Sequence, residues 1–341
     1  MENLKLFFEG NDYCTIFFKK NVKHISVNYN ECDFVVSSNF EFGNANKEYI
    51  QKSLNKYNNS PKRVIVFLIS DYNNELKIPS NVILFRTSIY KSIKKQNEYI
   101  LPYIWESFYD DFQSLAKTKK PIVGFCGNVK NNTGLRESTM QKIESDTRIA
   151  TNFIKHIGFG GGKSELIERF KNNILNSHFT ICNRGMGNFS IRFYQVLSLG
   201  RIPVLLDTDM VFPFDKKINW DSYIIKAKTE TQLTQKINNW WTQKNETDVI
   251  EVQQKCRQLF EDYFSEKGFG SQIFNFLIIE KNNPKIIKSE KPFFLKFPHL
   301  KYKIKKKIAT IKINLNKKSE TNKHTESLFS HKNQIEIIVN Y

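Results

Sequence analysis

Short apolar runs, separated by amphipathic stretches, make up the first third of the chain. Residues 63–70, RVIVFLIS, are apolar on both faces and are followed by Asp71. Strands of this kind, separated by helices, are typical of a mostly parallel sheet that is covered on both sides. We therefore predict an α/β unit over residues 1–115. Its predicted elements are strands at 24–29, 33–38, 63–70, 81–88 and 97–105 and a helix at 47–57.

A second α/β unit is predicted over residues 116–283, beginning with the buried strand PIVGFCG at 121–127. Residues 178–207 read as a strand, the loop NRGMGN, a helix that stops at Gly200, and a second strand. Gly suits that stop because it readily adopts the left-handed backbone that ends many helices. The order predicts a right-handed βαβ unit. Further helices are predicted from GLRESTMQKI, SELIERFKNNILN, 229–243 and 246–266.

The segment Gly160-Gly161-Gly162-Lys163-Ser164 resembles a phosphate-binding P-loop. A P-loop needs Gly five residues before the Gly that precedes Lys, and that position is Ile157. It also follows a buried strand, whereas the apolar residues of 147–158 have a spacing closer to a helix than to alternation. We interpret the segment as a flexible Gly-rich loop. A flap over a bound ligand, with Lys163 touching phosphate, is a further hypothesis.

The loop 183–188 has chemistry better suited to phosphate. Gly185 and Gly187 allow the backbone to approach a ligand closely. The following helix directs its free N–H groups and positive dipole end towards the loop. We expect Ser190 or Asn188 to cap that helix.

Two arginines add positive charge to this region. Arg184 lies in the loop and Arg192 lies in the first turn of the helix. A guanidinium is always charged and binds phosphate oxygens in pairs, which suits both binding of a diphosphate and its stabilisation as a leaving group. The alternative for Arg192 is a salt bridge with a neighbouring carboxylate.

The formal net charge of +18 is concentrated near the end of the chain. Residues 284–318 hold twelve lysines against one acid, Glu290, and these lysines alternate with Phe, Leu, Ile and Tyr. This mixture is typical of a segment on an anionic membrane surface, where each basic residue contributes about 1 kcal/mol. We therefore expect no nucleic-acid partner; a solvated tail without a partner is the alternative.

Cysteine usage and hydropathy favour the cytoplasm. The five cysteines are far apart and form no CxxC pair, which argues against a disulfide framework and a zinc site. No stretch approaches the roughly 18–20 apolar residues that span a bilayer. The apolar start is interrupted by Glu9 and Asp12, unlike a signal peptide. We predict a cytoplasmic protein, peripheral on the inner membrane face through residues 284–318.

The run from residue 181 to residue 225 resembles the core of the exostosin-type glycosyltransferases, family 47. That pattern has a Gly-containing loop, a helix that starts with Ser and Arg and ends in Gly, then Ile-Pro-Val, Pro-Phe and Ile-x-Trp. The matching residues are Ser190, Arg192, Phe193, Gly200, Ile202-Pro203-Val204, Pro213-Phe214 and Ile218-Asn219-Trp220. VGFCGN with Arg136 downstream, and NEYILPY, extend the resemblance, which covers roughly 120–230 with a weaker match over 30–105.

The resemblance implies a GT-B fold, that is, two Rossmann-like domains facing a cleft, here followed by a lysine-rich tail at 284–341. It implies an inverting enzyme whose C-terminal domain binds a nucleotide-sugar and whose N-terminal domain presents a glycan or lipid-linked glycan acceptor. No metal or other cofactor is expected, because arginines and N–H groups neutralise the diphosphate. The implied donor-binding residues are Gly127, Asn128, Arg136, Arg184, Gly185, Gly187, Asn188, Ser190, Arg192, Gln195 and Asp209.

One position departs from the family pattern. The family usually has an acid three residues after the helix arginine, suited to the ribose hydroxyls, and this chain has Gln195. An amide can still accept a hydrogen bond, but the charge-assisted part, about half of the strength, is lost. Asp207-Thr208-Asp209 matches a short DxD metal motif, which we interpret as the polarity of a loop.

An inverting transfer needs a general base to take the acceptor proton. Asp71, at the end of an apolar strand, is the leading candidate, with Glu98 and Glu106 behind it. A strand-end cap is the alternative for Asp71, and Arg192 is the second predicted catalytic residue. The leading hypothesis is sugar transfer in the synthesis of a surface polysaccharide, lipopolysaccharide or capsule. The alternative is a non-catalytic basic protein of the same fold that binds nucleic acid or another anionic polymer.

Overall fold

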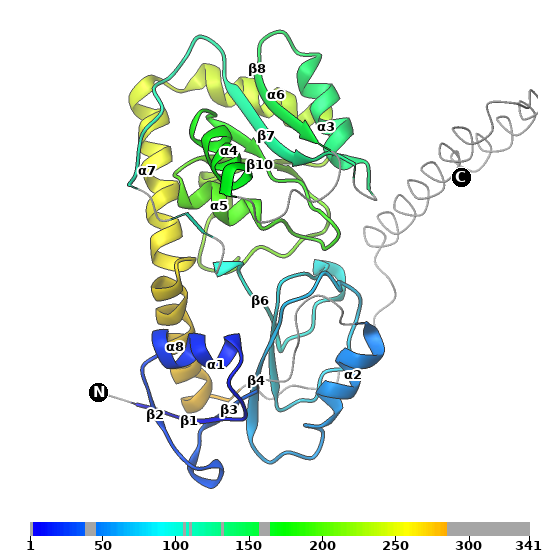
Figure 1. Ribbon diagram of the computed structural model, residues 1–341, viewed down its shortest axis with the longest axis vertical. Coiled ribbons are helices and arrows are strands. Elements are labelled where there is room, and N and C mark those ends of the chain that lie inside the picture. The colour runs from blue at the N-terminus through cyan, green and yellow to red at the C-terminus, as the bar shows by residue number, and fades with distance from the viewer. Residues whose placement is uncertain are drawn as a thin grey trace, which may run out of the picture.

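The computed structural model describes residues 3–37, 46–104, 107–108, 111–130, 133–156 and 164–284. Three regions named above lie outside this part: the Gly-rich segment 157–163, Glu106, and the tail from residue 285 onwards. Two α/β units follow one another along the chain and are joined along one side by the last helices (Figure 1). The predicted class, two units built on parallel sheets, is confirmed.

The first unit contains a six-stranded sheet in which all neighbours are parallel, in the order β2-β1-β3-β4-β5-β6. Alternate residues of the central strands enter two separate apolar clusters, one on each face. The strands are β1 (Leu4–Phe8), β2 (His24–Ser26), β3 (Phe34–Val36), β4 (Arg63–Leu68), β5 (Val82–Arg86) and β6 (Glu98–Ile100). Helices α1 (Tyr13–Asn21) and α2 (Lys47–Asn55) cover opposite faces, and two 3-10 turns lie at Tyr29–Glu31 and Lys91–Ile93.

The second unit contains a five-stranded parallel sheet in the order β11-β10-β9-β7-β8. The strands are β7 (Ile122–Asn128), β8 (Ala150–His156), β9 (Phe179–Ile181), β10 (Ile202–Leu206) and β11 (Ile225–Ala227). The helices are α3 (Leu135–Glu144), α4 (Ser164–Leu175), α5 (Arg192–Ser198), α6 (Glu230–Gln243) and α7 (Glu246–Tyr263), with a 3-10 turn at Trp220–Ser222.

The helical spacing read from residues 147–158 is wrong, because residues 150–156 of this stretch form strand β8. Strand β8 pairs with β7 along its whole length, from Ala150 to His156, and lies at the edge of the sheet. Its residues are mostly half-buried, since an edge strand is covered only in part. Without one fully buried face, the apolar positions do not alternate cleanly, and the sequence period is misleading.

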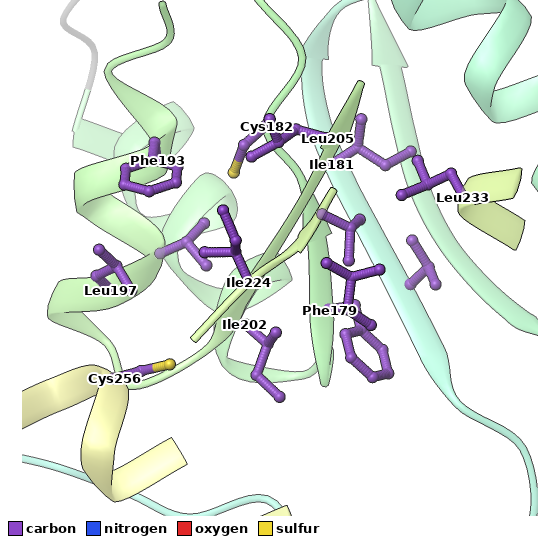
Figure 2. Close-up of a cluster of buried hydrophobic side chains, with 14 of the residues drawn as sticks. Phe179, Ile181, Cys182, Phe193, Leu197, Ile202, Leu205, Ile224, Leu233 and Cys256 are labelled. Atoms are coloured by element: carbon purple, nitrogen blue, oxygen red, sulfur yellow. The ribbon is translucent and has the colours of Figure 1, made fainter. Parts of the chain in front are cut away.

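Helix α5 is completely buried and anchors the predicted βαβ unit. All seven of its residues are buried, and Phe193 and Leu197 pack against side chains of β9, β10 and α7 (Figure 2). The helix stops before Gly200, whose φ of 65° is the left-handed conformation predicted for it. The first residue of α5, Arg192, is therefore held in place by a packed core on every side of its helix.

The last helix returns to the first unit. Helix α8 (Glu266–Asn282) lies beside α1 and against the first sheet (Figure 1). Its residues Phe269, Ile273 and Leu277 belong to the apolar cluster that contains α1, although residues up to 283 were assigned to the second unit. At its end, the Glu280 carboxylate pairs with Arg63 at 2.7 Å. The first unit is thus completed by residues far away in the chain.

Substituting Phe269 by alanine should destabilise the protein by about 3–5 kcal/mol, the usual cost of removing a buried aromatic ring. The ring is 1% exposed, and its centroid lies 5.6 Å from that of Phe17 and 6.4 Å from that of Phe67. Urea unfolding measures the change. Ile279→Ala on the same helix is the control, since Ile279 is 58% exposed and should cost under about 0.5 kcal/mol. Equal losses for both variants would contradict this packing.

Of the helices in the described ranges, none has both the length and the apolar composition needed to cross a membrane.

Candidate functional site

Two arginines from different helices converge at the carboxyl end of β7. Arg192 donates from Nη2 to the carbonyl of Cys126 at 2.8 Å, and Arg136 of α3 donates from Nη1 to the carbonyl of Asn128 at 3.0 Å. Both guanidinium groups lie over the ring of Phe125, with their central carbons 4.3 Å and 5.8 Å from its centroid. The sequence resemblance predicted this pair, and the structure brings it together.

Neither arginine has a counter-charge among the described residues. Arg192 is 7% exposed, its hydrogen bonds to described residues all run to backbone carbonyls, and its buried Nε has no hydrogen-bond partner. The described ion pairs include neither Arg192 nor Arg136, so Arg192 forms no salt bridge with a carboxylate in the described part of the chain. The side-chain oxygen of the adjacent Asn128 is also buried without a partner.

The pKa values show that the two positive charges are costly in this place. Burial lowers the pKa of Arg192, and burial followed by the charge of Arg192 lowers the pKa of Arg136 to about 9. The neighbouring thiols supply no negative charge, because burial raises the pKa of Cys126 and raises that of Cys182 to about 12. A bound anion would remove this penalty, since it favours the charged form of both arginines.

Two glycines leave room for the arginines. A Cβ on Gly127, whose φ is 145°, would lie 2.7 Å from Nη2 of Arg192. A Cβ on Gly185 would lie 3.3 Å from Nη2 of Arg136. The predicted donor-binding residues that the structure gathers at this end of β7 are therefore Gly127, Asn128, Arg136, Gly185 and Arg192. We call these five residues the arginine site.

The other part of the loop 183–188 faces the first unit. The Gly187 N–H donates to Oδ1 of Asp71 at 3.1 Å, and the Asn188 N–H donates to Oγ of Ser88. Arg184 donates to the hydroxyl of Tyr90 at 2.7 Å. Asp71 follows β4 and Ser88 follows β5, so the carboxyl ends of the strands in the two sheets face each other here.

Asn188 is the centre of this contact between the units, and all of its side-chain hydrogen bonds are used. Its Oδ1 accepts from Arg184 at 2.9 Å and from Thr208 at 2.8 Å. Its Nδ2 donates to the carbonyls of Ile89 at 3.2 Å and Asp209 at 3.3 Å. A saturated, fully buried amide has no bond left to offer a ligand.

Asp209 also belongs to this contact. It has a φ of 60°, and its carboxylate accepts the Ser92 N–H at 3.1 Å. Arg184, Gly187, Asn188 and Asp209 are thus engaged between the units. Their donor-binding role stays a prediction, and the Asn188 side chain has no hydrogen bond left for it in this arrangement. Within the described residues, no group of three or more His, Cys, Asp or Glu side chains has the geometry of a metal site.

The expected cap of α5 is not formed. Ile191 occupies the N-cap position and no side chain bonds there, although Ser190 or Asn188 was predicted to do so. The N–H groups of residues 193–195 instead bond to the carbonyls of Ser190 and Ile191 in a tight turn. The arginines, rather than the helix end, therefore provide the positive charge. Gln195 is 9% exposed on the same short helix.

The two other acids considered as a general base differ from Asp71. Glu98 is 1% exposed and is paired with Arg86 at 2.9 Å, so its carboxylate is occupied. Glu106 lies outside the described residues. Asp71 is exposed and, within the described part of the chain, accepts one hydrogen bond, from the Gly187 N–H, so its second oxygen is open to an acceptor hydroxyl.

Sequence reasoning missed the partners in the first unit: Ser88, Tyr90 and Ser92. A signal for them was present, because polar residues directly after a buried strand lie at the same sheet edge as Asp71. It also missed Phe125, the ring beneath both guanidinium groups, which looked like an ordinary core residue of β7.

The exostosin GT47 domain model matches residues 65–238. Among solved structures, TarM is 14% identical over 72% of this chain, with a TM-score of 0.41. The chain spans only half of the length of TarM, 50%. WaaG, a glycosyltransferase involved in lipopolysaccharide biosynthesis, is 9% identical over 80% of this chain and 99% of its own, with a TM-score of 0.40. A UDP-N-acetylglucosamine 2-epimerase is 9% identical over 85% of this chain and 99% of its own, with a TM-score of 0.34. No curated protein matches the chain.

Proposed function

Because the chain belongs to the exostosin GT47 family of glycosyltransferases, we propose that it transfers a sugar from a nucleoside-diphosphate sugar to a glycan acceptor with inversion at the anomeric carbon. The observation that carries this proposal is the buried guanidinium of Arg192 beside the partly buried one of Arg136, neither of which pairs with a carboxylate among the described residues. A diphosphate carries the negative charge and the oxygen acceptors that these groups lack.

In the proposed reaction, the oxygen of an acceptor hydroxyl bonds to the anomeric carbon while the bond from that carbon to the diphosphate oxygen breaks. The bonding electrons leave with the nucleoside diphosphate, whose growing charge the two arginines stabilise. Asp71 takes the proton of the hydroxyl. Its position supports this role, since Asp71 contacts Gly187, two residues from the Gly185 that adjoins Arg136.

We further propose that the acceptor belongs to a surface polysaccharide or lipid-linked glycan and that transfer occurs at the cytoplasmic membrane face. The lysine-rich stretch 284–318 supports this location by its composition, because interleaved basic and apolar residues favour anionic lipid surfaces. From residue 285 onwards this stretch lies outside the described residues, so the membrane contact stays a prediction from sequence.

A thermal-shift panel tests the donor class. UDP-, GDP- and dTDP-sugars, with inorganic pyrophosphate as the minimal probe, are compared with a CMP-sugar, which carries a single phosphate. A ligand present at 100 times its dissociation constant adds about 2.7 kcal/mol to the free energy of unfolding. We expect at least one diphosphate compound to raise Tm clearly and the CMP-sugar to have a smaller effect.

Absence of any shift with all diphosphate compounds would contradict the proposal. Binding of nucleic acid with a steep dependence on salt concentration, without any nucleotide-sugar binding, would indicate the basic binding protein instead.

A further inference from the structure

Three consecutive residues at the end of β5 contact both segments that meet near Asp71. Ser88 accepts the N–H of Asn188 from the loop of the second unit. Arg86 and Thr87 bind the loop 70–75, which follows β4 and carries Asp71. One short stretch therefore determines how two loops from different units lie relative to each other.

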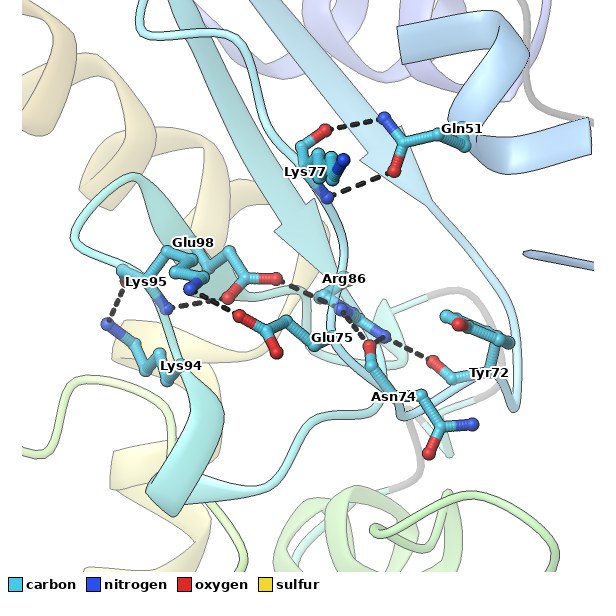
Figure 3. Close-up of polar contacts among 9 residues, drawn as sticks. All are labelled: Gln51, Tyr72, Asn74, Glu75, Lys77, Arg86, Lys94, Lys95 and Glu98. Carbon is cyan, nitrogen blue, oxygen red and sulfur yellow. Dashed lines mark hydrogen bonds and ion pairs between the residues drawn. The ribbon is translucent and has the colours of Figure 1, made fainter. Parts of the chain in front are cut away.

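Arg86 holds the loop by its backbone. Its Nη2 donates to the carbonyl of Tyr72 at 2.5 Å, and its Nη1 donates to the carbonyl of Asn74 at 3.2 Å (Figure 3). The guanidinium also lies over the ring of Tyr72, 5.8 Å from its centroid. Arg86 is 1% exposed, so the donor end of these bonds is buried, although the loop itself is partly exposed.

A carboxylate fixes the arginine in turn. Glu98 Oε1 accepts from Nη1 of Arg86 at 2.9 Å, while Oε2 accepts the Lys95 N–H at 2.7 Å (Figure 3). This pair is charge-balanced, in contrast to the arginine site, where no anion is present among the described residues. The difference indicates that Arg86 has a structural role in the loop and is not a ligand-binding residue.

Thr87 fixes the residue on the other side of Asp71. Its Oγ1 donates to the carbonyl of Ser70 at 2.8 Å and accepts the Ser70 N–H at 3.1 Å. Residues 70 and 72, the two neighbours of Asp71, are thus both bonded to β5. The carboxylate of Asp71 is exposed, yet its backbone is held from both sides.

We propose that Arg86, oriented by Glu98 and assisted by Thr87, is a positioning residue that places the Asp71 carboxylate for proton transfer. This inference rests on the proposed function, in which Asp71 is the general base. The physical reason is that a short exposed loop has many conformations, and a displacement of about 1 Å can reduce turnover about 100-fold.

The experiment uses Arg86→Lys, Thr87→Val and Thr87→Ser in the full chain. Lysine keeps the charge but loses the fork that bonds two carbonyls, valine removes both bonds to Ser70, and serine retains the hydroxyl. Arg63→Lys is the matched control. Arg63 begins β4 of the same sheet and pairs with Glu280 at 2.7 Å, but it lies at the opposite strand end from Asp71.

Two measurements are made: calorimetry gives the affinity for UDP and GDP, and steady-state kinetics give kcat and KM for hydrolysis of the nucleotide-sugar that stabilises the protein best. In hydrolysis, water replaces the acceptor and gives its proton to the same base. We expect Arg86→Lys and Thr87→Val to lower kcat by about 10-fold to 100-fold, with nucleotide affinity within about twofold of the parent. Thr87→Ser should restore kcat, and Arg63→Lys should not lower it.

The inference is overturned if Arg86→Lys and Thr87→Val keep the parent kcat, or if Arg63→Lys lowers it equally. Thr87→Val still decides the question if Arg86→Lys does not fold. Asp71→Asn, measured in parallel, separates the two hypotheses. Full activity of Asp71→Asn would contradict the proposed base, whereas an inactive Asp71→Asn with active Arg86→Lys and Thr87→Val would contradict only the positioning role.

Discussion

Replacing Arg192 by methionine is expected to weaken nucleoside-diphosphate binding about 30-fold or more, without loss of stability in the ligand-free protein. The loss of affinity follows from removing a buried cation that faces the proposed diphosphate, a change that typically costs 2–5 kcal/mol. With the donor no longer held, we expect transfer to be abolished. Calorimetric titration with UDP and GDP measures the change in affinity.

The free energy of unfolding of ligand-free Arg192→Met distinguishes a ligand-binding arginine from a structural one. In the free protein, Arg192 is a buried charge beside a second, partly buried charge, Arg136, and its Nε has no partner. Replacing a buried ion pair by apolar side chains of similar size is often neutral or stabilising by about 1–4 kcal/mol, and burying an ion that has no partner costs more than burying a pair. Against this stands the loss of the bonds to the Cys126 and Ile181 carbonyls, about 1 kcal/mol each. We expect the free energy of urea unfolding to stay equal or rise.

Arg201→Met is the matched control. Arg201 is also 1% exposed, but it bonds to the carbonyls of Leu175 and Gln113 at 2.9 Å and to those of Leu199 and Gly200. Its removal leaves several buried carbonyls without a donor and should cost about 3 kcal/mol or more, while nucleotide binding is retained. If Arg192→Met proves as destabilising as Arg201→Met, then Arg192 is a structural residue and the anion site is refuted.

Gly187→Ala is expected to reduce turnover about 100-fold while leaving nucleotide affinity nearly unchanged. A Cβ at this position would lie 2.7 Å from Oδ1 of Asp71 and 2.9 Å from Oγ of Ser88. Both distances are shorter than a carbon–oxygen contact allows, so either the Asp71 carboxylate rotates away or the two units separate. In each case the proposed base is displaced. The arginine site contacts the loop at Gly185 instead, so nucleotide affinity should change little.

Gly185→Ala distinguishes the two functions of this loop. Its Cβ would lie 3.3 Å from Nη2 of Arg136, which should weaken UDP or GDP binding more than it lowers kcat. Steady-state kinetics of donor hydrolysis, together with calorimetric titration, give both quantities for each variant. Equal effects of the two substitutions on affinity and on kcat would contradict the division of the loop into a donor side and a base side.

The parts of the site that could be predicted are those in which strand, loop and helix follow one another within a short stretch of the chain. The strand, loop, helix and strand between residues 178 and 207 follow directly from the apolar pattern and from Gly200. Arg136 and Arg192 could be paired only through the family resemblance, because nothing local links two helices 56 residues apart in the chain. The structure shows that both reach the end of the same strand, β7.

The rest depends on contacts between distant segments. Asn188 and Arg184 look like ligand-binding residues in a Gly-containing loop, yet their bonds run to Ile89 and Tyr90 in the first unit. The glycine at 187 serves close approach, as predicted, but the group that approaches is Asp71 of the same chain. Sequence patterns report which residues tolerate close contact and do not report what comes into contact with them.

The return of α8 to the first sheet has a consequence for the order in which the chain folds during synthesis. Domains generally fold as units, and those nearest the N-terminus usually fold first on the ribosome. Here the apolar face formed by Leu4, Phe17 and Phe67 is covered by Phe269 and Ile273, which are translated more than 200 residues after Phe17. The second unit can therefore complete its core before the first one does, although the first unit precedes it along the chain.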